Sequence, residues 1–205
     1  MTIRLHRGDL PDLSHYRGGA VAVDTETMGL MPRRDRLCVV QLSPGDGSAD
    51  VVQIPPNAPG APNLAALLAD SNILKIFHFA RFDLGVIHQT LGVMPAPVYC
   101  TKIASRLART YTDRHGLKDL VRELLGIDLS KQQQSSDWGA ETLTPAQLDY
   151  AASDVLHLHE LKGKLDALLQ RENRLGIAHQ CFDFLPTRAQ LDLLGWSEID
   201  IFAHS

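Results

Sequence analysis

The sequence predicts an α/β fold in which a mixed sheet is flanked by helices. Runs rich in valine and isoleucine dominate the first part of the chain, whereas helical periodicity dominates the chain after residue 64. Strands that are followed by alternating strand and helix, and then by helices, are typical of this architecture. The 205 residues suffice for one domain with its own hydrophobic core, and we predict that residues 1–205 form a single domain.

Three runs rich in branched apolar residues predict the first strands. They span residues 20–24, 37–42 and 51–54, and turn-forming stretches such as SPGDGSAD separate them. Because consecutive strands tend to be neighbours in a sheet, we expect these three to form an antiparallel meander.

In the segments after residue 64, the spacing of apolar residues is alternately that of a helix and that of a strand. Residues 64–70 are expected to form a short helix, 74–79 a buried strand, and 80–92 a helix that ends at its last glycine. The polar stretch KQQQSSDWG, residues 131–139, is expected to be a loop in which Trp138 serves as a packing anchor.

The clearest helix start lies at Thr144. Threonine can cap a helix, the proline that follows fits the first helical position, and Gln147 stands three residues after the cap. One apolar stripe then follows, made of Leu148, Ala151, Ala152, Val155, Leu158, Leu161 and Leu165.

Composition and charge exclude several classes of protein. With 44% hydrophobic and 21% charged residues, the chain has a globular rather than a disordered or coiled-coil composition. Its formal net charge of -4 argues against a wide surface that holds long duplexes, but leaves a short nucleic-acid substrate open. Three cysteines without paired spacing, a charged first stretch and the lack of a long apolar run predict a cytoplasmic protein that binds no membrane.

Acidic residues follow two of the predicted strands. Asp24 and Glu26 in VAVDTETMGL are two residues apart, so their side chains point to the same side of a strand. Asp83 lies in the first turns of a helix among apolar side chains, where a charge is costly unless it is paired or bound to a metal. The alternatives are a solvated turn for the first pair, and neutralisation of Asp83 by Arg81 or by the helix N-terminus.

Tyr150 and Asp154 are four residues apart on the helix that begins after Thr144. This spacing presents a phenol and a carboxylate side by side on one helix face. An ordinary pair on the helix surface is the alternative interpretation.

Taken in this order, the three acidic segments resemble the DEDD superfamily of 3′-5′ exonucleases, in its tyrosine branch. The stretches HGLKDLVRELLGIDL, SSDW and QLDYAASDVLHLHEL are similar to ribonuclease D, and this similarity extends from residue 20 to about residue 170. The helical modules that follow the nuclease domain of ribonuclease D have no counterpart in the sequence. With its length, its KQQQSSDW segment and its ending LDLLGWSEIDIFAHS, the whole chain most resembles the nanoRNase C family of alphaproteobacterial oligoribonucleases.

The resemblance implies a ribonuclease H-like fold with a site for two divalent metal ions. Tyr150 would orient the attacking water. The four carboxylates of the site would be Asp24, Glu26, Asp83 and Asp154. An all-oxygen ligand set favours Mg²⁺ or Mn²⁺ over Zn²⁺, and two such ions balance four carboxylates in charge. Because the acids repel one another without metal, we expect raised pKa values in the metal-free protein.

Three residues are candidates for contacts with nucleobases. Leu30 has a placement similar to the oligoribonuclease leucine that wedges between the last two bases, although an ordinary apolar turn residue would look the same. His78 and Phe79 could stack on a base or belong to the core. Phe79 also marks a departure from the family pattern, since many relatives carry asparagine there and the local contact to the substrate backbone is left open.

A modest excess of positive charge is expected to face a substrate phosphate. Residues 102–131 contain seven lysines and arginines and four acids, a local balance of +3. We look for phosphate contacts there, together with the hydroxyls of Ser135 and Ser136, although half of these bases would merely solvate helix faces.

Large apolar side chains crowd the end of the chain, where a free tail would fray. They are Trp196, Ile199, Ile201 and Phe202. We interpret residues 171–205 as a C-terminal helical and apolar extension that either covers the chain's own core or, as we prefer, docks on another subunit. Members of the nanoRNase C family form ring-shaped octamers, so the resemblance implies a homo-oligomer.

These observations predict a divalent-metal-dependent 3′-5′ exoribonuclease that degrades very short single-stranded RNA, in particular dinucleotides, to nucleoside 5′-monophosphates. Trimming of longer RNA in the manner of ribonuclease D and action on DNA are the alternatives within the same chemistry. RNA and DNA are not distinguished, because no residue can be shown to read a 2′-hydroxyl. A catalytically silent scaffold that binds nucleic acid is the alternative of another class, but a scaffold has no physical need for a costly cluster of acids.

Overall fold

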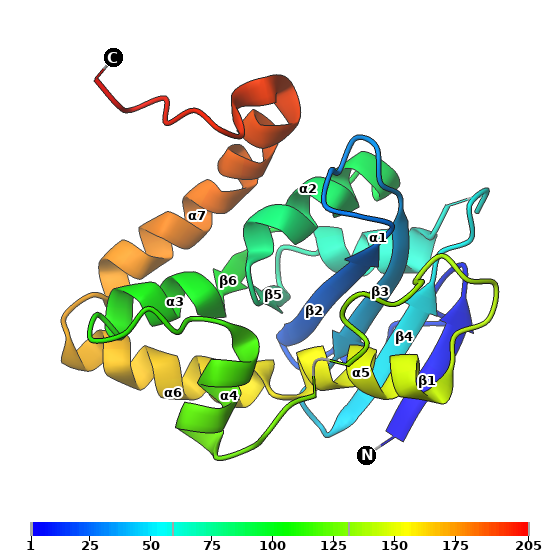
Figure 1. Ribbon diagram of the computed structural model, residues 1–205, viewed down its shortest axis with the longest axis horizontal. Coiled ribbons are helices and arrows are strands. Elements are labelled where there is room, and N and C mark those ends of the chain that lie inside the picture. The colour runs from blue at the N-terminus through cyan, green and yellow to red at the C-terminus, as the bar shows by residue number, and fades with distance from the viewer. Residues whose placement is uncertain (1, 59, 131, 205) are drawn as a thin grey trace.

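A mixed sheet of six strands is the framework of the structure, a computed structural model that describes residues 2–58, 60–130 and 132–204. The strand order is β1-β4-β3-β2-β5-β6, and helices flank the sheet (Figure 1). The strands are β1 (Thr2–Arg7), β2 (Ala20–Thr27), β3 (Leu37–Ser43), β4 (Ser48–Gln53), β5 (Leu74–Phe77) and β6 (Val98–Cys100). This architecture confirms the predicted fold class.

The predicted antiparallel meander is also confirmed. β2 pairs with β3 and β3 pairs with β4, in both cases antiparallel. Every residue of β3 and β4 is buried. Their runs of valine therefore read as almost continuously apolar, which is why the sequence indicated them clearly.

The outermost strands, β1 and β6, were not predicted. β1 pairs in parallel with β4, where Arg4 Nε donates to Asp50 Oδ1 at 2.7 Å and His6 Nε2 lies 2.7 Å from the same oxygen. Burial opposes ionisation of Asp50, but hydrogen bonds from Arg4, Tyr16 and His6 outweigh it and lower the pKa of this carboxyl to about 2. Contacts with Asp50 thus hold β1 against β4. The strand therefore lacks the alternation of apolar and polar residues by which a strand is predicted from sequence. β6 pairs in parallel with β5 and, with three residues, is too short to show a period.

Seven α-helices are present in the described ranges. They are α1 (Pro62–Ala69), α2 (Ala80–Leu91), α3 (Thr101–Ala108), α4 (Leu117–Leu125), α5 (Pro145–Leu156), α6 (Leu158–Arg171) and α7 (Leu175–Leu191). A 3₁₀ turn at Ser14–Tyr16 and a π-helical turn, η2 (Asp192–Trp196), complete the helical elements. Within the part of the chain that the structure describes, none of the helices combines the length and apolarity that crossing a bilayer requires.

The predicted helix boundaries at Gly92 and Thr144 are both confirmed. α2 ends before Gly92, whose φ of 71° lies in the left-handed region that favours glycine. Thr144 Oγ1 accepts from the Gln147 backbone amide at 3.2 Å, while Gln147 Oε1 accepts from the Thr144 amide at 2.9 Å, which completes a capping box. The apolar stripe that follows is divided between two helices, because α5 ends and α6 begins at His157.

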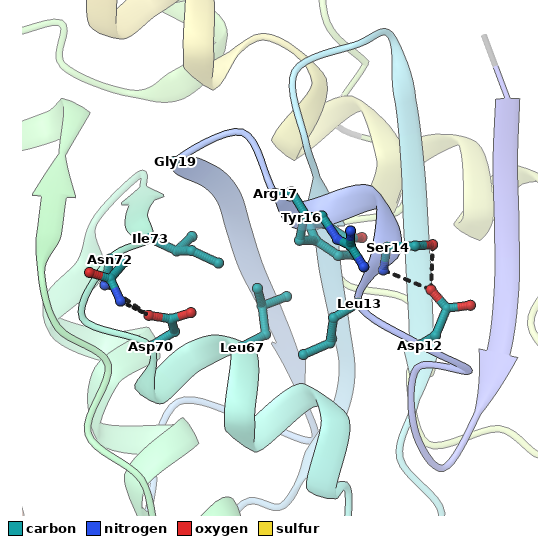
Figure 2. A pocket seen from close by; sticks show the side chains of 10 residues that line it. All are labelled: Asp12, Leu13, Ser14, Tyr16, Arg17, Gly19, Leu67, Asp70, Asn72 and Ile73. Atoms are coloured by element: carbon teal, nitrogen blue, oxygen red, sulfur yellow. Dashed lines mark hydrogen bonds between the residues drawn. The ribbon is translucent and has the colours of Figure 1, made fainter.

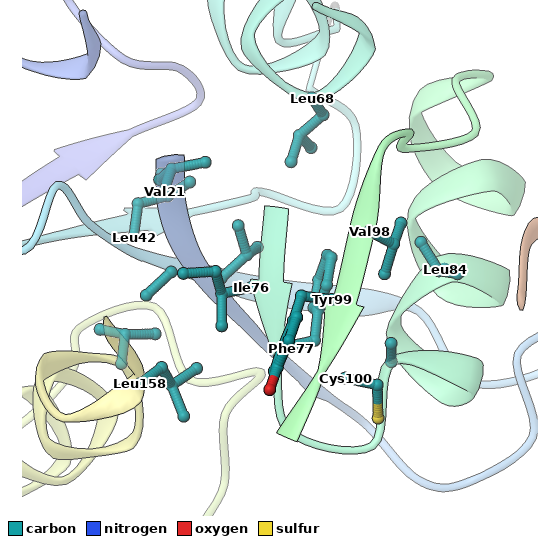
Figure 3. Close-up of a cluster of buried hydrophobic side chains, with 14 of the residues drawn as sticks. Val21, Leu42, Leu68, Ile76, Phe77, Leu84, Val98, Tyr99, Cys100 and Leu158 are labelled. Carbon is teal, nitrogen blue, oxygen red and sulfur yellow. The ribbon is translucent and has the colours of Figure 1, made fainter. Parts of the chain in front are cut away.

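Figure 3 shows part of the main hydrophobic core. Val21, Leu42 and Ile76 from three strands are buried there. Leu68 of α1 and Leu158 of α6 belong to the same cluster. This core fixes the helices on the sheet and so determines where their polar side chains meet the strands. The predicted loop over 131–139 forms turns and bends from residue 132 onward, and Lys131 lies outside the described residues.

Candidate active site

The two carboxylates of β2 point to the side of the sheet that α5 covers. Asp24 pairs with Gln41 and Glu26 pairs with Val39 in the register of β2 and β3. Side chains directly opposite in an antiparallel pair share a face, and Val39 belongs to one buried cluster with Ala151 of α5. Asp24 and Glu26 therefore face α5, as their spacing of two residues predicts.

Helix α5 supplies the third carboxylate of the site. Its capping box fixes where the helix begins, and the spacing of four residues places Tyr150 and Asp154 on one face. Carboxylate oxygens of Asp24, Glu26 and Asp154 all lie within 4.8 Å of one another. Asp154 thus joins the acids of β2, and the interpretation as an ordinary surface pair is wrong.

Tyr150 lies between the acids and a buried indole. Its ring centroid is 6.0 Å from that of Trp138, which is 3% exposed and forms the predicted packing anchor. Burial raises the pKa of Tyr150 above its usual value, and the charges of Asp154 and Glu26 raise it further. The phenol therefore keeps its proton at neutral pH.

Asp83 approaches the cluster from α2. Thr25 lies between Asp24 and Glu26 in β2, so its side chain points to the opposite face, and Thr25 Oγ1 donates to Asp83 Oδ1 at 2.6 Å. Asp83 is not one of the three acids that converge within 4.8 Å. Its charge nevertheless acts, after burial, to raise the pKa of Asp24 and Glu26. The site is therefore a triad of acids with a fourth acid beside it.

No arginine neutralises Asp83 in the described structure. Arg81 precedes it by two positions in the same turn, but Arg81 Nε donates to Asp192 Oδ2 at 2.5 Å instead. More generally, each ion pair of a lysine or arginine within the described ranges has its carboxylate outside the four-acid cluster. The alternative in which Arg81 satisfies Asp83 is wrong.

Burial raises the pKa of every acid in the cluster, and repulsion by neighbouring acids adds to the shift of two of them. Burial raises the pKa of Asp24 well above its usual value, and that of Glu26 to about 9, with the neighbouring charges adding to both. Burial also raises the pKa of Asp83 and of Asp154 to about 7, although hydrogen bonds from Thr25 and Tyr150 oppose the shift. These directions agree with the expectation for acids without a counter-ion.

Two polar residues of the site, Thr25 and Gln41, were not predicted. Gln41 Nε2 donates to Asp24 Oδ2 at 3.2 Å, and Gln41 Oε1 is buried without a hydrogen-bond partner in the described structure. A single glutamine inside an apolar strand carries no periodic signal. The position of Thr25 between Asp24 and Glu26 was the one sequence signal for its role. A residue between two acids that face the same side of a strand must face the other side.

The donor set fits a hard divalent cation. Three carboxylates that converge on one point, with a fourth beside them and no basic partner in the described structure, are costly to ionise until a cation binds. Oxygen ligands without cysteine or histidine match the preference of Mg²⁺ and Mn²⁺ rather than that of Zn²⁺.

Leu30 and Phe79 line one cavity of about 600 Å³, which α2 and the segment 192–198 also line. Leu30 is 83% exposed and Phe79 is 44% exposed, so neither belongs to the core. Phe79 has a φ of 70°, in the left-handed region that non-glycine residues rarely adopt, and such strain concentrates at functional sites. Lys102 Nζ lies 4.3 Å from the Phe79 ring centroid, a cation-π contact that no sequence pattern indicated.

His78 is a fixed and neutral ring. Its Nδ1 lies 2.9 Å from Thr101 Oγ1, which anchors the imidazole to the start of α3. Burial lowers the pKa of His78 to about 3, and the nearby charge of Lys102 lowers it further. The imidazole therefore carries no charge at neutral pH, whatever it contacts.

The residues expected to face a phosphate differ in whether their side chains are available to a substrate. Ser135 is exposed, whereas Ser136 Oγ accepts from Gln147 Nε2 at 3.2 Å and so joins its loop to the start of α5. Arg109 is fully buried and paired with Glu123, so it is not available to a substrate. The free positive charge of this region is therefore smaller than the sequence indicates.

A second cavity lies away from these residues. It measures about 440 Å³, and it is lined by polar side chains such as Asp12, Asp70 and Asn72 (Figure 2). Gly19, which also lines it, immediately precedes β2, whereas the acids lie toward the other end of that strand. None of the predicted site residues lines this cavity.

Comparisons with known proteins agree with this geometry. Residues 12–170 match a family model described as 3′-5′ exonuclease. Ribonuclease D of Gluconacetobacter diazotrophicus is 39% identical over 158 residues, which cover 76% of this chain and 39% of that relative. Ribonuclease D of Xanthomonas oryzae is 32% identical over 199 residues, which cover 96% of this chain and 54% of that relative. The chain thus spans about two fifths to one half of the length of these curated relatives.

Solved structures are similar as well. Brucella melitensis NrnC bound to pGG is 63% identical, with a TM-score of 0.97 and 100% of both chains covered. Brucella melitensis NrnC with bound Mg²⁺ is 62% identical, with a TM-score of 0.96 over the same full coverage. Escherichia coli RNase D is 28% identical, with a TM-score of 0.74 that covers 84% of this chain and 45% of that one. The resemblance predicted from the motifs is confirmed.

The pKa shifts predict how stability depends on pH. We expect the free energy of unfolding of the metal-free protein to fall as the pH rises from about 5 to about 9. Acids whose native pKa is raised make the folded protein bind more protons than the unfolded chain in this window, so deprotonation disfavours folding. Bound Mg²⁺ should reverse the trend and add about 2.7 kcal/mol at 100 times its dissociation constant.

Urea unfolding at several pH values, with chelator or with Mg²⁺, measures both effects. Asp24→Asn serves as the comparison, because removal of one charge should flatten the pH dependence in chelator. Stability that rises with pH over this window in the metal-free wild type would contradict the assignment of repelling, ion-free acids.

Proposed function

This chain belongs to the family of 3′-5′ exonucleases, and we propose that it is a divalent-metal-dependent exoribonuclease that degrades very short RNA to nucleoside 5′-monophosphates. One observation carries the proposal: carboxylates of β2 and α5 converge within 4.8 Å, with the Asp83 carboxylate and the Tyr150 hydroxyl beside them. Buried acids without a counter-ion are costly, and phosphodiester hydrolysis is the chemistry that such a cluster serves when it binds metal.

We propose that the four acids hold two ions. Asp24, Glu26 and Asp154 would bind one, and Asp83 together with Asp24 would bind the other. Two divalent ions at such a site activate a water, stabilise the leaving oxygen and relieve the charge of the phosphate. Mg²⁺ is the proposed ion, with Mn²⁺ as the alternative, and two ions balance the four carboxylate charges.

Tyr150 would orient the attacking water. Its phenol is protonated at neutral pH, so it can donate or accept a hydrogen bond but cannot act as a strong base. Contact with Trp138 on one side and with the acids on the other restricts the direction of the hydroxyl. Positioning of this kind lowers the barrier because less freedom is lost on reaching the transition state.

The proposed substrate contacts are mostly independent of base identity. Leu30 would wedge between the last two bases, and Phe79 and His78 would offer apolar or aromatic surface, which any nucleobase accepts. Ser135 and Ser136, with nearby basic side chains, would contact a phosphate. Because few phosphates can be neutralised, binding should depend only weakly on salt, as a short RNA requires. The protein is proposed to act in the cytoplasm, in agreement with three cysteines that form no disulfide.

We further propose that residues 1–205 act as one domain whose extension, residues 171–205, docks on a second copy of the chain. Trp196, Ile199, Ile201 and Phe202 are all exposed. Arg188 donates to the Trp196 carbonyl, which holds the start of this segment against α7. Exposed apolar side chains on a held segment favour association with another surface of the same protein. The ring-shaped octamer implied by the resemblance is the proposed assembly.

RNA length is the decisive test of the proposed substrate. We expect 5′-labelled RNA of two nucleotides to be cleaved faster than RNA of seven or twenty nucleotides, in the presence of Mg²⁺ and not in chelator. Matching DNA oligonucleotides separate ribose from deoxyribose specificity. Equal rates at every length would favour trimming in the manner of ribonuclease D, and absence of cleavage everywhere would favour a binding scaffold.

The roles of Tyr150 and Asp154 predict different kinetic defects. Tyr150→Phe should lower kcat by roughly 10²- to 10⁴-fold with KM for the dinucleotide nearly unchanged, because only the orienting hydroxyl is lost. Asp154→Asn should nearly abolish turnover and weaken Mg²⁺ binding. Steady-state kinetics and calorimetric Mg²⁺ titration measure these effects. Wild-type rates in Asp154→Asn would refute the site.

The docking extension is tested by light scattering. A chain truncated after Glu198 keeps the Ser197 carbonyl that accepts from Arg81, but loses Ile199, Ile201 and Phe202. We expect this variant to form smaller species than the full chain. Ile127→Ser, which changes an exposed apolar residue elsewhere, should leave the assembly intact. An unchanged mass after truncation refutes docking through this segment.

A further inference from the structure

Thr25, the residue between the two acids of β2, holds the acid of α2. Its hydroxyl donates to Asp83 Oδ1 at 2.6 Å, and this is the side-chain hydrogen bond that the Asp83 carboxylate receives in the described structure, beside backbone hydrogen bonds at Asp83 and Thr25. We propose that Thr25 is a positioning residue of the metal site, which fixes the Asp83 carboxylate with a neutral donor and leaves its charge available to a divalent cation. This inference rests on the proposed function, because it concerns the ligands of the same site.

The contact between Thr25 and Asp83 is rigid and dry. Thr25 is 7% exposed and Asp83 is 3% exposed, so water does not compete for the hydrogen bond. Threonine is branched at Cβ, and its place inside the paired part of β2 restricts its rotamer. The hydroxyl is therefore directed before any ion binds, and the carboxylate of Asp83 follows it.

A neutral donor directs a carboxylate without neutralising it. A lysine or arginine at the position of Thr25 would hold Asp83 equally well, but its charge would compete with a cation for the same oxygens. The one arginine close by in sequence, Arg81, is engaged by Asp192. Asp24, like Asp83, accepts a hydrogen bond from a neutral side chain, the amide of Gln41, at 3.2 Å. The surrounding residues thus orient the acids and preserve their negative charge.

A purely structural role is the competing explanation. The hydrogen bond also connects β2 to α2, so its loss could lower stability without any effect on metal binding. The two roles differ in what they predict for the Mg²⁺ requirement. Outer residues that orient metal ligands typically change metal affinity by 10- to 100-fold when they are replaced, whereas a remote buried hydrogen bond changes stability alone.

Thr25→Val and Thr25→Ser test the proposal in the full-length chain. Valine keeps the shape and removes the donor, whereas serine keeps the donor. We expect Thr25→Val to raise the Mg²⁺ concentration for half-maximal dinucleotide cleavage by roughly 10- to 100-fold, and to reduce the rise in Tm that Mg²⁺ causes without substrate. KM at saturating Mg²⁺ should be unchanged, and Thr25→Ser should restore both readouts toward the wild type.

Ser43→Ala is the matched control, because Ser43 Oγ donates to the Ser48 carbonyl at 2.7 Å elsewhere in the same sheet. It should lower Tm and leave the Mg²⁺ requirement unchanged. A Thr25→Val protein that behaves like this control overturns the proposal, and Thr25→Ala takes its place under the same criteria should the valine variant not fold. If the wild type shows no Mg²⁺-dependent cleavage, the proposed function fails, while the Mg²⁺-induced rise in Tm still decides the role of Thr25.

Discussion

Four carboxylates without a basic partner in the described structure impose an energetic cost that the rest of the fold must offset. Burial raises the pKa of each of them, and repulsion adds to the shifts of Asp24 and Glu26, so the ion-free site opposes folding at neutral pH. The stability that offsets this cost comes from apolar packing elsewhere. β3 and β4 are buried throughout, and the main core joins the sheet to α1, α2 and α6. A weaker sheet could not keep these acids together before an ion arrives.

Strand order explains why residues so distant in sequence meet. β2 lies inside the sheet between β3 and β5, so helices can pack on it from both faces. One face presents Asp24 and Glu26 to α5, and the alternate residue, Thr25, presents its hydroxyl to α2. The side-chain period of two in a strand thus divides the site between two helices, and each helix contributes one carboxylate. An edge strand would offer less support for a site that is built from both faces.

Features that depend on neighbouring residues in the chain were predictable from the sequence, whereas contacts between distant segments were not. The capping box of Thr144 and the left-handed Gly92 are local and carry recognisable residue types. The three acidic segments were found because their order matches a known family, although their convergence depends on strand pairing that no local signal encodes. Gln41 escaped notice for this reason, since its role arises only from standing opposite Asp24 in register. β1 was not predicted because Arg4 and His6 contact one buried carboxylate on β4, so the strand lacks apolar alternation.

Hydrogen bonds connect the C-terminal segment to the helix that carries Asp83. Arg81 stands two positions before Asp83 in α2, and it donates both to Asp192 and to the Ser197 carbonyl. Arg188 of α7 donates to the same Asp192, so two guanidinium groups clamp one carboxylate at the point where α7 ends. Arg81 and Asp192 also line the cavity that Leu30 lines. These hydrogen bonds therefore connect the segment after Asp192 to the first turn of α2, which also carries the carboxylate that Thr25 holds.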